Sequence, residues 1–107
     1  MVTHAKKKRK MLLSVQELEE LIATAIGEDV VPVIHILLRT DENVSEFKIA
    51  EILNITVNQA RNMLYRLYER NMVLFLRKKD KKKGWYIYYW GINWNGVEGT
   101  WRKTKVQ

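Results

Sequence analysis

The chain contains no cysteine among its 107 residues, so disulfide bonds, zinc fingers and thiolate chemistry are excluded within it. Proline occurs once and glycine five times, which is typical of a globular chain rather than a disordered one. No stretch approaches the ~18 consecutive apolar residues that a membrane-spanning helix needs, so no membrane partner is expected. These absences leave a single domain whose stability must come from a modest apolar core.

Acidic residues are scarce in two segments of this chain, whose formal net charge is +7. Residues 1–10 carry five basic and no acidic residues, and residues 77–83 carry six basic and one acidic. Residues 11–76 between them carry ten acidic and five basic residues, a balance of −5. A domain that reads duplex DNA normally carries positive charge on its recognition helix, so this acidic body argues against such a role.

Residues 1–13 are predicted to be a flexible basic tail. The basic run Lys6–Lys10 is followed by only three apolar residues, Met11–Leu13, too few for the apolar part of a signal peptide. We therefore expect an intracellular protein, cytoplasmic in a cell without a nucleus or nuclear in a eukaryote. The basic run itself fits a nuclear-import signal, a nucleic-acid-binding arm or a merely solubilising tail.

Two helices are predicted in the first part of the body. Ser14 and Glu17 have the spacing of a capping box, in which each side chain accepts a hydrogen bond from a backbone N–H of the first helical turn. Apolar residues at helical spacing follow until Gly27, which marks the end of this helix. Asp29 is predicted to cap the second helix, which tolerates Pro32 in its first turn because no backbone donor is needed there.

A helix-turn-helix follows the second helix. Ser45 is expected to cap a third helix, and Asn54-Ile55 to form a tight turn after it. Thr56–Gln59 is a second capping box and begins a fourth helix that extends to about Arg70. The short connection between two helices is typical of a DNA-binding or protein-binding helix-turn-helix.

A hairpin is predicted after the fourth helix. Alternating apolar residues indicate strands over 72–79 and 84–92, joined by a four-residue turn at 80–83. Both faces of the second strand are apolar, so one face must pack on the helices while the other is covered by a terminal helix or offered to a partner. The expected pairs across the hairpin are Lys79 with Gly84, Arg77 with Tyr86, Phe75 with Tyr88 and Val73 with Trp90.

The predicted fold is therefore α+β, mainly α: a winged helix-turn-helix over residues 14–92 with an extra N-terminal helix. Residues 93–107 form a C-terminal extension of ambiguous structure. Trp94, Val97 and Trp101 have helical spacing, which favours a C-terminal helix, yet Gly96 and Gly99 each cost about 1 kcal/mol relative to alanine in a helix.

The turn of the hairpin is the first candidate site. Lysine ammonium groups bind phosphates without reading sequence, and Trp85 and Tyr86 offer an aromatic interface near the turn. The alternative is a solvated turn whose lysines prevent edge-to-edge aggregation of an apolar strand pair. The candidates for contact with nucleic acid are Arg77, Lys78, Lys79, Lys81, Lys82, Lys83, Trp85 and Tyr86.

The exposed side of the fourth helix is the second candidate site. Arginine, asparagine and tyrosine suit a protein interface, and the acidic body favours this use over contact with DNA. The alternative is reading of base edges in the major groove of a duplex by Arg61, Asn62 and Arg66. The candidates for contact with a protein partner are Asn58, Arg61, Asn62, Tyr65, Arg66 and Tyr88.

No catalytic or metal-binding constellation is found in the sequence. The two histidines, His4 and His35, lie far apart in it, and no cluster of potential ligands has metal-site spacing. The hydroxyl residues Ser14, Ser45 and Thr56 are explained as helix caps, and no glycine-rich phosphate loop is present. We therefore expect neither an enzyme nor a bound cofactor.

Several segments together resemble a known family, the extended winged-helix domain of archaeal transcription factor E, which is the counterpart of the large subunit of eukaryotic general factor IIE. The resemblance covers about residues 14–102 and is most distinctive in the aromatic strand followed by Ile-Asn-Trp. The segments that carry it are Asp29–Leu38, Ile49–Ile55, Val57–Leu64, Gly84–Trp90 and Ile92–Trp94.

This resemblance implies a general transcription initiation factor that binds the clamp of RNA polymerase and assists promoter opening. It implies that the lysines of the wing, with Trp85 and Tyr86, meet the polymerase and single-stranded promoter DNA at the edge of the bubble. The TATA-binding protein is a further implied partner. The family normally continues through a helix into a cysteine-rich zinc ribbon, which this chain of 107 residues lacks.

Two other functions stay open at the level of the sequence. One is a sequence-specific winged-helix regulator that reads duplex DNA. The other is a winged helix used purely for protein interaction, which would leave the lysines of the wing without nucleic acid.

Overall fold

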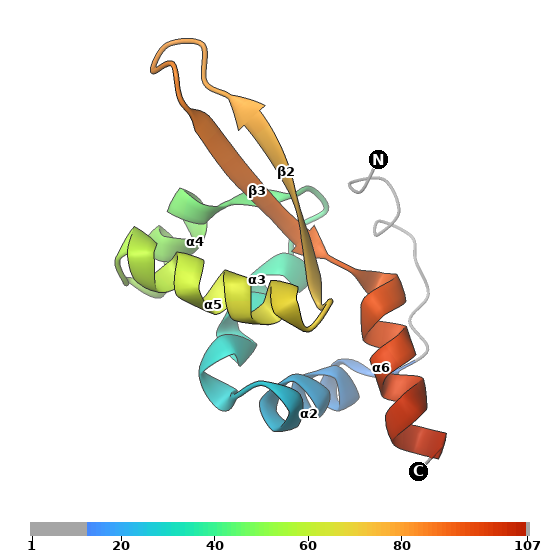
Figure 1. The fold of residues 1–107 in the computed structure, drawn as a ribbon. Helices are drawn as coiled ribbons and strands as arrows, with labels where there is room; N and C mark the ends of the chain where they lie inside the picture. The colour runs from blue at the N-terminus through green and yellow to red at the C-terminus, as the bar shows by residue number, and fades with distance from the viewer. Residues whose placement is uncertain (1–12, 107) are drawn as a thin grey trace.

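The computed structural model describes residues 13–106 and has the predicted α+β winged-helix fold (Figure 1). Of the predicted basic tail, only Leu13 belongs to the described residues, and it is buried. The elements in chain order are α2 (Val15–Ala25), the short 3₁₀ helix η1 (Glu28–Val30), α3 (Val31–Leu38), β1 (Val44–Ser45), α4 (Glu46–Leu53), α5 (Val57–Glu69), β2 (Val73–Lys79), β3 (Tyr86–Ile92) and α6 (Trp94–Val106).

The helix starts follow the predicted caps, because each cap is a local arrangement of neighbouring residues. The Ser14 hydroxyl accepts from the Glu17 N–H at 3.0 Å, and the Glu17 carboxylate accepts from the Ser14 N–H at 2.9 Å. Thr56 and Gln59 make the same reciprocal pair at the start of α5. Ser45 caps α4 by accepting from the backbone N–H of a residue in its first turn.

The predicted cap of the second helix is wrong. This segment begins with η1, and α3 starts after Val30, which offers no side-chain cap. The carboxylate of Asp29 is instead bound to the guanidinium of Arg66 on α5. A charged partner 37 positions along the chain competed with the local backbone donors, and a sequence pattern cannot reveal that competition.

The hairpin joins a three-stranded antiparallel sheet of order β1–β3–β2. The predicted register is wrong by two residues, since Val73 pairs with Ile92, Phe75 with Trp90 and Lys79 with Tyr86. Because side chains alternate with period two along a strand, this shift keeps every residue on its predicted face. The short strand β1, absent from the prediction, extends the sheet along β3.

The longer turn has a local cause. The Asp80 carboxylate accepts from the backbone N–H groups of Lys82 and Lys83 at 2.9 and 3.1 Å. Gly84 adopts φ +78°, a conformation open to glycine, and its N–H donates to the Asp80 carbonyl at 2.7 Å. The Asp80 N–H donates to the Trp85 carbonyl at 2.8 Å and closes a loop that includes Gly84 and Trp85.

One apolar core joins the helices to the base of the wing. Leu18, Ile34, Leu64 and Trp90 come from α2, α3, α5 and β3, and all four are fully buried. Figure 1 shows the far end of the hairpin projecting beyond the helices, with α2 and α6 at the opposite end of the molecule. The core therefore anchors the base of the wing and leaves its turn in solvent.

The C-terminal extension forms a helix, α6, despite its two glycines. Gly96 lies against the backbone where α5 ends: a Cβ atom there would stand 1.9 Å from the Asn71 carbonyl oxygen. Gly99 faces open space, with nothing within 4 Å of such an atom. Trp94 and Val97 are buried, so packing offsets the helix cost of the glycines.

Candidate nucleic-acid and protein interfaces

The predicted nucleic-acid residues come together on the projecting end of the wing. Arg77, Lys78, Lys79 and Lys81–Lys83 are all exposed. The bonds made by Asp80 fix the path of the loop and leave these cationic groups directed to solvent. The arrangement presents a compact group of positive charges that can follow a phosphate backbone.

Three of these cations lie over aromatic rings of the same hairpin. The Arg77 guanidinium lies 4.3 Å from the centre of the Tyr86 ring. The ammonium groups of Lys78 and Lys83 lie 5.6 and 5.7 Å from the ring centres of Tyr89 and Trp85 respectively. Because Trp85 and Tyr86 are 54% and 50% exposed, aromatic surface and positive charge are offered together.

A second aromatic group lies nearer the base of the wing, where α5 packs on the sheet. The ring centres of Tyr65 and Trp90 are 5.9 Å apart, those of Tyr68 and Phe75 are 5.3 Å apart, and those of Phe75 and Tyr88 are 5.0 Å apart. Trp90 is buried, whereas Tyr65, Tyr68 and Phe75 remain 45%, 42% and 37% exposed. This base cluster (Tyr65, Tyr68, Phe75, Tyr88 and Trp90) covers part of one face of the hairpin.

Tyr68 and Phe75 were not among the sequence candidates. The signals were present, because Tyr68 follows Tyr65 by one helical turn and Phe75 shares its strand face with Arg77. Tyr88, a predicted partner residue, is half-buried between Phe75 and Trp90. On the opposite face of the hairpin Leu74, Leu76, Ile87 and Tyr89 are half-buried.

Arg61 on α5 is held by a partner inside the body. Its Nε and Nη2 atoms donate to the two carboxylate oxygens of Glu46 on α4, both at 3.0 Å. These hydrogen bonds raise the pKa of Arg61 above its ordinary value, and the Glu46 side chain is only 2% exposed. Arg61 could read a base only by leaving a buried carboxylate unpaired, which is costly.

The other two arginines of this region are also engaged. Arg66 donates to both carboxylate oxygens of Asp29, at 2.6 and 3.1 Å, and to the Ile26 carbonyl at 3.3 Å. The bond to Arg66 holds the pKa of the Asp29 carboxyl below its usual value. Arg70 donates to the Ala25 carbonyl at 2.9 Å. These contacts fasten α5 to the α2–η1 connection.

The remaining candidates on α5 are uncharged and accessible. Asn58, Asn62 and Tyr65 are exposed, and Asn58 and Asn62 line a shallow pocket of about 390 Å³. Its floor and rim combine apolar groups with side-chain amides and the Asp29–Arg66 pair. The residues that line this pocket are Asp29, Ile55, Asn58, Gln59, Asn62, Met63 and Arg66.

Among residues 13–106, no group of three or more His, Asp or Glu side chains comes together as potential metal ligands. In the same part of the chain, every helix is too short or too polar to cross a membrane.

The architecture is similar to that of solved winged-helix proteins. The ferric uptake regulator Fur of Helicobacter pylori matches with a TM-score of 0.58, at 20% sequence identity. The match covers 79% of this chain and 62% of Fur, whose structure is described as having three functional metal-binding sites. At this identity the likeness concerns the fold alone.

Comparison with related sequences identifies the family, which the likeness of fold does not. Transcription factor E of Metallosphaera sedula is 37% identical over 78 residues, which is 73% of this chain and 44% of the relative. Transcription factor E of Saccharolobus solfataricus is 40% identical over 73 residues, which is 68% of this chain and 41% of the relative. The chain thus spans less than half the length of these relatives. The family described as TFIIE alpha subunit matches residues 16–105, and the chain belongs to this family of transcription factors.

Proposed function

We propose that this domain acts in transcription initiation by binding RNA polymerase and assisting promoter opening, in the nucleoid of an archaeal cell. The observation that carries the proposal is the contrast between the wing and α5. The cations of the wing are exposed and lie beside exposed Trp85 and Tyr86, whereas Arg61 and Arg66 are bound to carboxylates of the body. Such a wing suits single-stranded DNA or the edge of a bubble better than base reading in a duplex.

The proposed nucleic-acid contacts are Arg77, Lys78, Lys79 and Lys81–Lys83 for phosphates, with Trp85 and Tyr86 for unpaired bases. Single-strand contacts change log K by about −0.7 per phosphate per tenfold change in salt, so three lysines account for a slope of about −2. Stacking of one base on an aromatic ring contributes roughly 1–3 kcal/mol. Binding by the wing is therefore expected to be sensitive to salt and indifferent to sequence.

The proposed polymerase surface is the exposed side of α5, with the polymerase clamp as its target. Asn58, Asn62 and Tyr65 supply polar and aromatic groups there, and Tyr88 supports the adjoining base cluster. Arg61 and Arg66 are proposed to hold α5 in position for this contact through Glu46 and Asp29. The TATA-binding protein is proposed as a further partner on the strength of the family alone.

A sequence-specific duplex reader is the rival function. It would need Arg61, Asn62 and Arg66 at the base edges, yet two of these three are committed to ion pairs. The body around them is also acidic, which opposes approach of a duplex along α5. We therefore favour the initiation function.

The test compares single-stranded, bubble and duplex probes by fluorescence anisotropy at two salt concentrations. We expect the triple variant Lys81→Gln, Lys82→Gln and Lys83→Gln to bind a single strand up to ~100-fold more weakly near 0.1 M salt, with the slope reduced by about 2. A matched control removes three exposed charges outside the wing: Lys48→Gln, Arg102→Gln and Lys103→Gln.

The same proteins are then used to capture purified archaeal RNA polymerase. The lysine variant should retain the polymerase, whereas Tyr65→Ala with Asn62→Ala should weaken its capture. Tight duplex binding that depends on sequence, or equal losses in the lysine variant and its control, would contradict the proposed function.

A further inference from the structure

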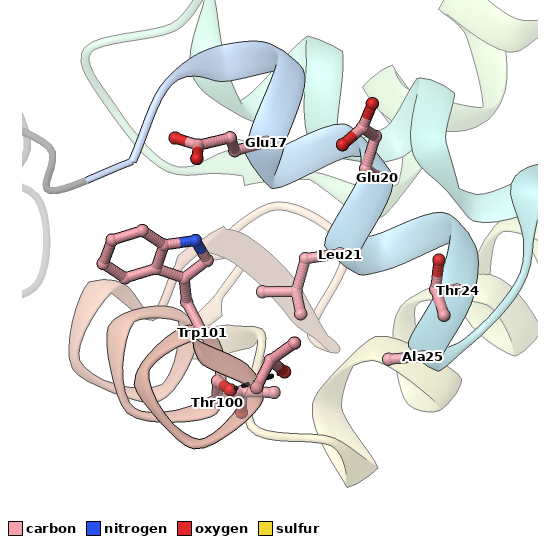
Figure 2. A pocket seen from close by; sticks show the side chains of 8 residues that line it. Glu17, Glu20, Leu21, Thr24, Ala25, Thr100 and Trp101 are labelled. Carbon is pink, nitrogen blue, oxygen red and sulfur yellow. Dashed lines mark hydrogen bonds between the residues drawn. The ribbon is translucent and has the colours of Figure 1, made fainter. Parts of the chain in front are cut away.

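A groove lies between α2 and α6, at the end of the molecule opposite the turn of the wing (Figures 1 and 2). Its volume is about 500 Å³. The prediction from sequence assigned nothing to this region, because it depends on the position of a helix that the sequence left ambiguous. The residues that line the groove are Glu17, Glu20, Leu21, Thr24, Ala25, Thr100, Trp101 and Thr104.

The floor and one wall of the groove are apolar. Leu21 and Ala25 lie one helical turn apart on α2, and the indole ring of Trp101 on α6 lies on the Leu21 side of the groove (Figure 2). Leu21 is 9% exposed and Trp101 is half-buried against the core, so both side chains are held in place by their packing. The narrow apolar part of a ligand would be shielded from water in this groove.

The rim on α2 is acidic. Glu17 and Glu20 are three residues apart on α2 and both line the groove; in Figure 2 the Glu17 side chain extends toward the Trp101 end and the Glu20 side chain points away from Leu21. The Glu17 carboxylate also accepts the capping hydrogen bond from the Ser14 N–H, which fixes its position. Glu20 is exposed at the mouth of the groove. Thr24, Thr100 and Thr104 bring further hydroxyl groups to the rim without adding positive charge.

We propose that this groove is a docking site for a basic peptide segment of a protein partner, with a lysine or arginine side chain as its anchor. The aliphatic stem of such a side chain would lie along Leu21 and the Trp101 ring while its charged head meets the Glu17 and Glu20 carboxylates. The α2 wall (Val15–Ala25) carries three acidic residues and no basic one, which favours a basic segment over an acidic one. Arg102 and Lys103 on α6 are exposed and are not among the residues that line the groove.

The site is independent of the wing. Figure 1 shows the turn of the hairpin at one end of the molecule and the α2–α6 pair at the other. A peptide in the groove and nucleic acid on the wing would therefore not compete for surface. The groove would thus give the domain a second binding site, which takes a positively charged ligand, whereas the wing takes a negatively charged one.

The test uses the intact chain and a capped Lys-Lys-Leu-Lys-Lys peptide, with a Gln-Gln-Leu-Gln-Gln peptide as the uncharged match. Binding is followed by the indole N–H signal of Trp101 in nitrogen-15 NMR spectra, assigned with Trp101→Phe. We expect the lysine peptide to shift this signal and the glutamine peptide to leave it in place. Raising the salt concentration should weaken the binding.

Variants of the rim sharpen the test. Glu20→Gln removes one exposed carboxylate and is expected to weaken binding roughly two- to fivefold. Glu20→Lys reverses the charge and should weaken it about tenfold or more. Glu69→Gln, which neutralises an exposed carboxylate on α5, is the matched control and should bind as the parent does. The NMR spectra themselves report whether each variant is folded.

Three results would overturn the proposal: no shift of the Trp101 signal, equal binding of the two peptides, or equal losses in Glu20→Gln and Glu69→Gln. The chain also has its own basic run, Lys6–Lys10, which is a rival occupant. Binding that appears only after these five residues are changed to glutamine would assign the groove to the chain's own tail and not to a partner. If the triple lysine variant of the wing also bound the lysine peptide more weakly, the two sites would not be independent.

Discussion

Residues 11–76 carry ten acidic and five basic side chains, whereas Arg77–Lys83 carry six basic and one acidic. The basic groups also differ in their surroundings. In the body, Arg61 and Arg66 each form a bidentate ion pair with a carboxylate on another element. In the wing, Arg77 lies over an exposed tyrosine ring of its own hairpin.

This comparison teaches that a count of basic residues does not locate a nucleic-acid site. A guanidinium that satisfies a carboxylate of its own fold contributes to the position of a helix, and its release would leave that carboxylate unpaired. A cation over an exposed ring has exchanged little hydration and can turn to a phosphate at small cost. The functional charge is therefore the charge that packing leaves uncommitted.

The largest effect should separate the base of the wing, which packs in the core, from its exposed turn, and it should appear at two tryptophans of the hairpin. Trp90 is fully buried and Trp85 is 54% exposed. We expect Trp90→Ala to lower the free energy of unfolding by roughly 3–5 kcal/mol. Trp85→Ala should change it by less than about 0.5 kcal/mol. Urea unfolding followed by circular dichroism measures both, and Trp90→Phe serves if the alanine variant does not fold. If both variants lost a similar free energy of unfolding, the contrast between a buried base and an exposed turn of the wing would be wrong.

The second effect concerns the helix that follows the wing. Gly96→Ala is expected to destabilise the fold by roughly 1–3 kcal/mol, because its new methyl group collides with the Asn71 carbonyl. Gly99→Ala has open space and should stabilise α6 by up to about 1 kcal/mol. Thermal unfolding of the matched pair gives the answer. A stabilised Gly96→Ala variant would show that α6 does not pack against the end of α5.

The third effect compares two arginines. Arg61→Ala should cost about 2 kcal/mol, a value reduced from that of a fully buried pair because the Arg61 side chain is 42% exposed. Arg77→Ala in the wing should cost about 0.5 kcal/mol. The double variant Glu46→Ala with Arg61→Ala should be less destabilised than Arg61→Ala alone, since no buried carboxylate is then left unpaired. Chemical unfolding of the four proteins tests this order.

The smallest effect is a dependence on pH. Because Arg66 lowers the pKa of Asp29 below 3.8, the pair stabilises the folded state fully above that value and loses its effect as pH falls through the lowered pKa. Asp29→Asn should therefore be less stable than the parent at pH 7, by less than about 1 kcal/mol, and equal to it once the carboxyl is protonated. Asp41→Asn, at an exposed aspartate, is the control. A gap that is equally large at pH 7 and at the lowest pH at which both proteins stay folded would contradict this origin.

Local patterns in the sequence predicted the elements well. The capping pairs at Ser14 and Thr56 fix helix starts through bonds between residues three positions apart, so the chain needs no distant partner to form them. Asn71 follows α5 with φ +64°, a left-handed conformation that asparagine adopts more readily than most residues. The exposed basic turn was predictable for the same reason, because charge and turn residues are adjacent in the chain.

Two of the three failures came from contacts between distant residues, whereas the third, the register of the hairpin, came from bonds within one loop. Asp29 was predicted as a helix cap and instead binds Arg66. The register of the hairpin depends on the bonds that Asp80 makes within its loop, and a four-residue and a longer turn fit the same alternation. Gly96 counted against a helix in the sequence, yet it is the residue type that the approach to Asn71 requires.

By itself, the sequence determined the order of helices and strands, the cap positions, the two-faced apolar hairpin and the separation of an acidic body from a basic wing. These features depend on residues close together in the chain, whose positions relative to one another follow directly from helix or strand geometry. Only the tertiary structure decided which arginines stay available, where α6 lies and that a groove exists between α2 and α6. Those features arise from contacts between residues that lie tens of positions apart in the chain. Which residues pair depends on how the helices and strands pack, and the sequence pattern does not show that.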